Sequence, residues 1–440
     1  MLFSRKDLWK LLGPLIIEQV LAVLVGMVDV LMVAAVGEAA VSGVALVDSI
    51  SILIIQLLAA LATGGAVICA QYIGKQRPDQ ACQAAGQLLL ITAVCSMVFA
   101  GVALSGGRGL LGVIFGRVEA AVMDNAATYF WITALSYPFL AVYNSGAALF
   151  RSMGNSRISM MASLIMNGIN IAGNAICIFG LHMGVEGVAI PTLISRMFAA
   201  VLIMLLLCHK GNIIRLQSLS QLKPERHMIR RILGVGIPSG LESGMFQFGK
   251  LALQSLVATL GTASIAGFAV ANNLATLQYL TGNALGLGII TIVGQCIGAG
   301  QAEQAKMYTK KLVAVNYGIL LIVCTVMIAA MGPITDIYNL SPEAAELTRN
   351  LMIAHSLAMI IWPPAFTLPH ALRAGMDIKF SMAVSVASMW IFRIGFGYVF
   401  VTFFHLGVMG IWYGMFIDWA VRTVLFVWRF KDFSRRVRRV

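Results

Sequence analysis

Twelve apolar segments, each long enough to cross the roughly 30 Å hydrocarbon core of a bilayer, divide this chain of 440 residues. Hydrophobic residues make up 59% of the sequence and charged residues only 11%, against roughly 25% charged residues in an average soluble domain. We therefore predict an all-α integral membrane protein with twelve transmembrane helices. The expected spans are residues 10–36, 44–73, 84–104, 126–150, 158–180, 188–208, 232–260, 265–297, 312–331, 348–372, 380–405 and 411–430.

The breaks between these spans alternate in charge. Every second break, together with both ends of the chain, carries most of the 31 Lys and Arg residues, whereas the intervening breaks are mainly acidic. Because basic residues stay on the cytoplasmic side, we expect a multi-pass protein of the cell membrane with both termini cytoplasmic. The net charge of +13 does not indicate a nucleic-acid partner, since the basic residues punctuate apolar segments instead of covering one folded face.

An internal repeat organises the chain. Sliding the sequence over itself by 224 residues aligns the first two spans of each half without a gap, and a shift of 222 aligns later positions. Matched pairs include Pro14 with Pro238, Glu18 with Glu242, and Arg151 with Arg373. Six spans separate the copies, and because six is even, both copies enter the membrane in the same direction.

Two parallel six-helix repeats around a central cleft are therefore expected. We place an N-terminal bundle at residues 1–208, a cytoplasmic linker at 209–231 and a C-terminal bundle at 232–440. Two similar bundles that rock against each other have the geometry of alternating access, which favours a secondary transporter.

Acidic residues inside the spans are the strongest candidates for function, because a charge at bilayer depth costs on the order of 2.5–3.5 kcal/mol on insertion scales. Glu18 and Asp29 lie eleven residues apart on the first span, so they share one helix face. We interpret Asp29 as an ion or proton site. Glu18 and its repeat mate Glu242 fit either a structural pair or a shared site for substrate charge, and the sequence leaves both open.

Other charged residues also lie within the spans. Asp48 and Lys250 are candidates to line the substrate cleft, and Lys250 could be the counter-charge of Glu242 or of another acid. Asp418 and Arg422 are four residues apart on the last span, a spacing that favours a structural ion pair within one helix.

Uncharged residues in the spans add two further candidates. Pro14 and Pro238 each remove a backbone hydrogen bond one turn before a glutamate, which predicts a bending point or a fixed kink. Asn170 and Asn174 lie one turn apart and offer neutral oxygen ligands, although such amides more often form hydrogen bonds between helices.

No motif for catalysis accompanies these residues. The sequence has no nucleophile elbow, HExxH or P-loop, and its seven Cys and six His are scattered. We therefore predict neither an enzyme nor a bound cofactor.

Several short motifs, in this order and with the repeat, resemble the multidrug and toxic compound extrusion (MATE) family of antiporters over essentially the whole chain. They are Gly13-Pro14 with Asp29, Gln71-Tyr-Ile-Gly74, Phe150-Arg151-Ser-Met-Gly154-Asn155, Asn170, Gly184-x-x-Gly187-Val-Ala and Leu372-Arg373-Ala-Gly375-Met-Asp377.

The resemblance implies a V-shaped exporter of organic, often cationic and amphipathic compounds, driven by inward H⁺ or Na⁺. Many members hold the coupling cation with an acid on the first helix, an Asn and an Asp on the fifth and a Thr on the sixth. The matching positions are Asp29, Asn170, Asn174 and Thr192.

The second carboxylate of that family site is an amide at Asn174, which should weaken Na⁺ binding, so the coupling ion stays H⁺ or Na⁺. Some relatives also use an acid eight residues after the proline of the seventh helix, where this chain has Phe246. We expect small organic molecules and membrane lipid as the only partners, and a functional monomer. The alternative is a flippase for lipid-linked precursors from the same wider superfamily, which would need a strongly cationic cleft.

Overall fold

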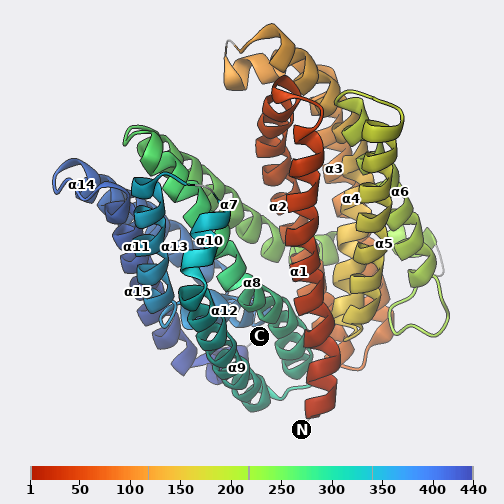
Figure 1. The fold of residues 1–440 in the computed structure, drawn as a ribbon. Coiled ribbons are helices and arrows are strands. Elements are labelled where there is room, and N and C mark those ends of the chain that lie inside the picture. The colour runs from red at the N-terminus through yellow and green to blue at the C-terminus, as the bar shows by residue number, and fades with distance from the viewer. Residues whose placement is uncertain (1, 117, 217–218, 339, 439–440) are drawn as a thin grey trace. The chain divides into compact units, whose positions relative to one another are not determined.

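The computed structural model describes residues 2–116, 118–216, 219–338 and 340–438. Residues 217 and 218 of the predicted linker, and residues 439 and 440 of the predicted C-terminal bundle, lie outside the described residues. Within the described residues the fold is helical throughout (Figure 1). The first helices are α1 (Arg5–Ala34), α2 (Glu38–Gly74), α3 (Pro78–Phe115), α4 (Ala120–Ser152), α5 (Ser156–Ala175), η1 (Ile176–Gly180), α6 (Glu186–Leu207) and η2 (Leu219–Leu222).

The second set of helices begins with α7 (Arg226–Ala258). It continues with α8 (Thr262–Gly298), α9 (Ala302–Ala329), α10 (Met331–Ile337), α11 (Pro342–Ala358), α12 (Trp362–Ala374), α13 (Ile378–Ser388), η3 (Met389–Phe396), α14 (Gly397–Thr402), α15 (Gly407–Lys431) and α16 (Phe433–Val437).

The chain divides into two compact units, at a point inside α7. The first, Phe3–Gly240, holds α1 to α6 and the beginning of α7, and is called the N-terminal half below. The second, from Leu241 onward, holds the rest of α7 and the later helices and is called the C-terminal half.

All twelve predicted spans are helical in the structure. Among the described residues, nine helices are long and apolar enough to cross a membrane, and ten when α11 and α12, bent by 55° at a short break, count as one span. The two remaining predicted spans lie in α4 and α7. These helices have 33 residues each, which exceeds the roughly 20 residues that a span requires. In the N-terminal half, α4 packs against α2, α3 and α6, and such an enclosed helix can carry more polar side chains.

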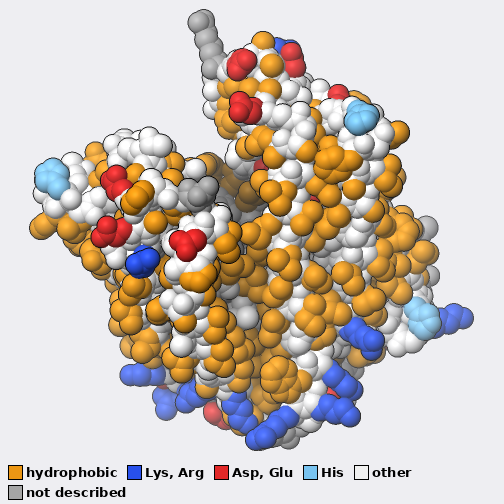
Figure 2. All heavy atoms as spheres, viewed as in Figure 1, with side chains coloured by type: hydrophobic (Ala, Val, Ile, Leu, Met, Phe, Trp, Pro, Cys, Tyr) orange, Lys and Arg blue, Asp and Glu red, His pale blue; other side chains and the backbone are white. Residues whose placement is uncertain are grey.

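Each half has its own apolar interior and an apolar outer surface. Leu58, Phe130 and Tyr137 belong to the core of the N-terminal half, and Trp412 and Trp419 to that of the C-terminal half. Figure 2 shows hydrophobic side chains over the middle of each half, Lys and Arg gathered at one end, and Asp and Glu at the other. This pattern is typical of a protein that spans a bilayer.

One span of each half contains a π-helical segment, although the two segments do not coincide at the repeat offset of 222. The fifth predicted span ends in the π-helical η1, and the eleventh contains the π-helical η3. The helices α1 and α7 continue through Pro14 and Pro238, so bending at these prolines stays a prediction. The third span extends past its predicted end at residue 104, because α3 continues beyond a break at Gly107, where φ is 39°.

Candidate functional site

The four residues predicted to bind the coupling cation form one chain of hydrogen bonds across α1, α5 and α6. Asn174 Nδ2 donates to Asp29 Oδ1 at 3.0 Å and lies 3.4 Å from Asn170 Oδ1. Asn170 Nδ2 donates to Thr192 Oγ1 at 3.0 Å, and the Thr192 hydroxyl donates to the Val188 carbonyl oxygen at 2.9 Å. The fold therefore brings together side chains that are far apart in the sequence.

The two amides of this chain are buried, and the acid at its end is partly exposed. Asn174 has no exposed surface, and its Oδ1 atom has no hydrogen-bond partner among the described residues. Asp29 keeps some exposed surface on α1. Asn174 also lies two residues before the π-helical η1, a geometry that is frequent at functional sites. The site thus joins an accessible carboxylate to a buried amide with an unused acceptor.

A second acid lies near this network in the N-terminal half. Tyr129 OH, on α4, donates to Asp48 Oδ1, on α2, at 3.5 Å. Arg196 on α6 interacts electrostatically with both Asp48 and Asp29, and its Nη1 donates to Ser136 Oγ at 2.6 Å. One arginine therefore attracts two acids in this half. Sequence spacing does not reveal that Arg196 lies near Asp29, because α1 and α6 are far apart along the chain.

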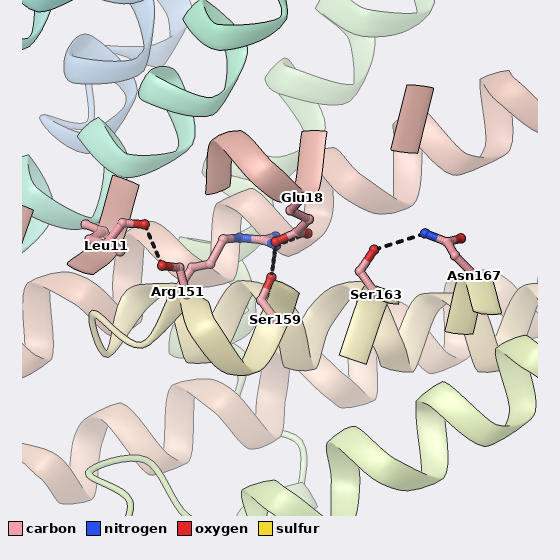
Figure 3. A network of polar contacts seen from close by, with 7 residues as sticks. Leu11, Glu18, Arg151, Ser159, Ser163 and Asn167 are labelled. Carbon is pink, nitrogen blue, oxygen red and sulfur yellow. Dashed lines mark hydrogen bonds and ion pairs between the residues drawn. The ribbon is translucent and has the colours of Figure 1, made fainter. Parts of the chain in front are cut away.

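Glu18, near the middle of α1, belongs to a different network (Figure 3). Arg151 Nη1, on α4, lies 3.5 Å from Glu18 Oε1, and Ser159 Oγ, on α5, donates to Glu18 Oε2 at 2.6 Å. Arg151 Nη1 also donates to Ser159 Oγ at 3.0 Å. The ion pair and hydroxyl together fasten α1 to α4 and α5.

The C-terminal half repeats this ion pair. Arg373 Nη2, at the end of α12, lies 2.8 Å from Glu242 Oε1 on α7, and both side chains are mostly buried. Glu242 is the repeat mate of Glu18, and Arg373 that of Arg151. The counter-charge of Glu242 is therefore Arg373 and not Lys250, because Lys250 makes no ion pair with any described acid. The repeat matches Glu18 to Glu242 and Arg151 to Arg373 in the sequence, but it does not show that each glutamate contacts its arginine.

The remaining predicted charges also lie in the C-terminal half. The predicted pair of Asp418 and Arg422 is confirmed, with Arg422 Nε 2.7 Å from Asp418 Oδ1 and both side chains buried. Lys250 lies over the ring of Phe246, its Nζ 5.2 Å from the ring centroid. Asp418 is thus structural, whereas Lys250 keeps a charge without an acid partner.

Comparison with known proteins identifies the family. The MatE family profile matches residues 14–176 and 238–399, about three quarters of the chain. The chain belongs to the MATE family of transporters. The two matched segments begin at Pro14 and Pro238, which agrees with the offset of the internal repeat. MATE proteins form a family of transporters and not of enzymes, as the sequence predicted.

Full-length MATE relatives and solved structures agree with this assignment. The chain is 27% identical over 437 residues to "Uncharacterized transporter YisQ" of Bacillus subtilis, covering 97% of this chain and 94% of YisQ. It is 26% identical to "Probable multidrug resistance protein NorM" of Thermotoga maritima, covering 96% and 91% of the two chains. A solved "Outward-facing conformation of a multidrug resistance MATE family transporter of the MOP superfamily" matches with a TM-score of 0.93 at 20% identity, covering 99% of this chain and 97% of that one. The fold of this chain is therefore the MATE fold.

The repeated Glu–Arg pairs give a test of structural against substrate-binding roles. We expect Glu242→Ala and Arg373→Ala each to lower the thermal midpoint of the purified protein, because each leaves one mostly buried charge unpaired. The double variant should lose less than the sum of the two, with a coupling of about 0.5–3 kcal/mol. Thermal unfolding of the four proteins in detergent measures this cycle. Additive losses would show that the two side chains are not coupled.

Proposed function

We propose that this MATE transporter exports small organic compounds by proton-coupled antiport, with Asp29 as the residue that carries the coupling proton. The observation that carries the proposal is the chain of hydrogen bonds that ends on the Asp29 carboxylate and links α1 to α5 and α6. The names of several relatives, "Probable multidrug resistance protein NorM", support organic compounds as the cargo.

The donor set around Asp29 fits a proton better than Na⁺. Hard cations in proteins take several oxygen ligands. Asn174 instead directs its Nδ2 toward Asp29, and the Asn170 oxygen lies against the same Nδ2. A single carboxylate faced by an amide donor does not fit Na⁺, so we assign the proton.

Protonation of Asp29 would reverse the order of donors and acceptors in this network. The ionised carboxylate accepts from Asn174 Nδ2, whereas a protonated Asp29 loses its charge and carries a donor of its own. The matching acceptor is Asn174 Oδ1, which is buried and has no hydrogen-bond partner among the described residues. When the Asn174 amide turns, its Nδ2 no longer donates to Asn170 Oδ1. The change is passed on to Thr192, because Asn170 Nδ2 donates to the Thr192 hydroxyl.

Because the hydrogen bonds reverse, the protonated and ionised forms of Asp29 stabilise different packing of the helices. The network holds α1 against α5 and α6, so each protonation state favours its own arrangement of these helices. A gradient drives transport only if proton and substrate prefer different states or compete for one. We propose that proton binding at Asp29 and substrate binding favour opposite ends of an alternating-access cycle.

The first prediction concerns Asp29 itself. Asp29→Asn keeps the size of the side chain and removes its titration, so it should abolish drug resistance in an export-deficient host while expression stays unchanged. Glu38→Gln, at the exposed start of α2, is the matched control and should retain full export. Full export by Asp29→Asn would reject the assigned role.

Asn174→Asp tests the choice of ion. The substitution restores a second carboxylate one turn from Asn170 and should create a site at which a Na⁺ gradient drives export. Export is measured in liposomes with a pH gradient and a Na⁺ gradient imposed separately. We expect the wild-type protein to respond only to the pH gradient, and a response of the wild type to Na⁺ at constant pH would contradict proton coupling.

We also propose that both termini face the cytoplasm, which the distribution of Lys and Arg supports. In a background in which the exposed Cys208 is replaced by Ser, a membrane-impermeant maleimide should label Glu38→Cys in intact cells. It should label Lys75→Cys, at the other end of α2, only after permeabilisation. The reverse pattern would invert the topology.

A further inference from the structure

Charge pairing in the C-terminal half leaves two cations unmatched. Within the described spans, Glu242 pairs with Arg373 and Asp418 with Arg422, and just before the eleventh span Asp377 pairs with Arg429 at 2.7 Å. Lys250 and Arg393 form no hydrogen bond or ion pair among the described residues, and the acid that attracts Arg393, Asp418, is already paired with Arg422. An unpaired charge at bilayer depth is energetically costly. The two unpaired cations are therefore candidates for a functional role.

The two cations converge on one aromatic ring. Lys250 Nζ lies 5.2 Å and Arg393 Cζ 5.5 Å from the centroid of Phe246. Each cation is attracted to the ring's negative face. The two positive charges repel each other, however, and the ring cannot neutralise them. An anion between or beside them would relieve this repulsion and replace the missing acid.

The cluster combines exposed and buried polar atoms. Lys250 is exposed, and Phe246 and Arg393 are partly exposed, but Arg393 Nε is buried and has no hydrogen-bond partner among the described residues. An unused guanidinium donor behind an accessible ammonium group suits a planar anion, because guanidinium binds carboxylate and phosphate through parallel hydrogen bonds.

The repeat shows that this cluster is not a duplicated structural element. At the offsets that match Glu242 to Glu18 and Arg373 to Arg151, the positions of Lys250 and Arg393 correspond to Gly26 and Ile171. Arg393 also lies within the π-helical η3, a rare geometry that is frequent at functional sites.

We propose that Lys250 and Arg393 form a binding site for an anionic group, a carboxylate or a phosphate, with Phe246 contacting the apolar part of the same molecule. The site assigns an organic anion or zwitterion to the cargo of this transporter. It rests on the proposed function only in treating the bound anion as cargo, since binding itself requires no proton coupling.

Equilibrium binding to the full-length protein in phosphatidylcholine nanodiscs tests this site. The probes are 1-naphthylacetate and the uncharged 1-naphthaleneethanol, which share the ring and differ in charge. Wild-type protein should bind the anion about tenfold more tightly than the alcohol. Lys250→Gln and Arg393→Gln should each weaken anion binding by about tenfold and leave alcohol binding unchanged. Lys250→Arg and Arg393→Lys keep the charge and should bind the anion within about threefold of wild type.

Equal affinities of the two probes for the wild type, or full anion affinity in a correctly folded Lys250→Gln variant, would overturn the proposal. Lys250 has exposed surface, so its variant decides the question even if Arg393→Gln fails to fold. Anion binding is measured without an ion gradient, whereas proton coupling is measured as export by Asp29→Asn, so failure of this site and failure of proton coupling give separate results.

A second set of nanodiscs identifies the source of the anion. Including phosphatidylglycerol weakens binding of the anionic probe to the wild type if the site accepts lipid headgroups. If phosphatidylglycerol does not change binding of the probe, the site is assigned to soluble organic anions. Either result supports the anion site, provided that Lys250→Gln abolishes the preference for the anionic probe.

Discussion

The cost of placing charge in a low-dielectric medium is the constraint on which the rest of this structure depends. Water cannot solvate a carboxylate or guanidinium at bilayer depth, so such groups need partners within the protein. Glu18 with Arg151, and Glu242 with Arg373, meet this requirement in the same way in the two halves. Each pair joins the first helix of its repeat to the end of the fourth span, and this connection holds the bundle together around the polar residues.

Duplication makes it possible to separate structural charges from functional ones. An ion pair that recurs in both halves, as Glu18–Arg151 and Glu242–Arg373 do, is expected to serve packing, because the two halves share their helix order. Asp29 and Lys250 have no charged counterparts, since the repeat places Leu253 and Gly26 there. The N-terminal half keeps two acids against Arg196, and the C-terminal half keeps two cations beside Phe246. The two halves have therefore diverged toward opposite charge.

In the proton-coupled mechanism that we propose, neutral polar side chains provide the switch at the N-terminal site. An amide can present either a donor or an acceptor to the same neighbour, so Asn174 can match both the ionised and the protonated form of Asp29. A second carboxylate at this position would instead repel Asp29 or require a metal ion between them. The substitution that distinguishes this chain from the family pattern is thus the one on which the choice of the proton depends.

The sequence by itself determined the positions of the twelve spans, the repeat and, through family resemblance, the four residues of the Asp29 network. Hydrophobic length and periodicity follow directly from the chain, because the bilayer imposes them on each segment separately. Which helices become neighbours depends on side-chain packing between segments far apart in the sequence. Only the tertiary structure could therefore assign Arg151 to Glu18, Arg373 to Glu242, and two cations to Phe246.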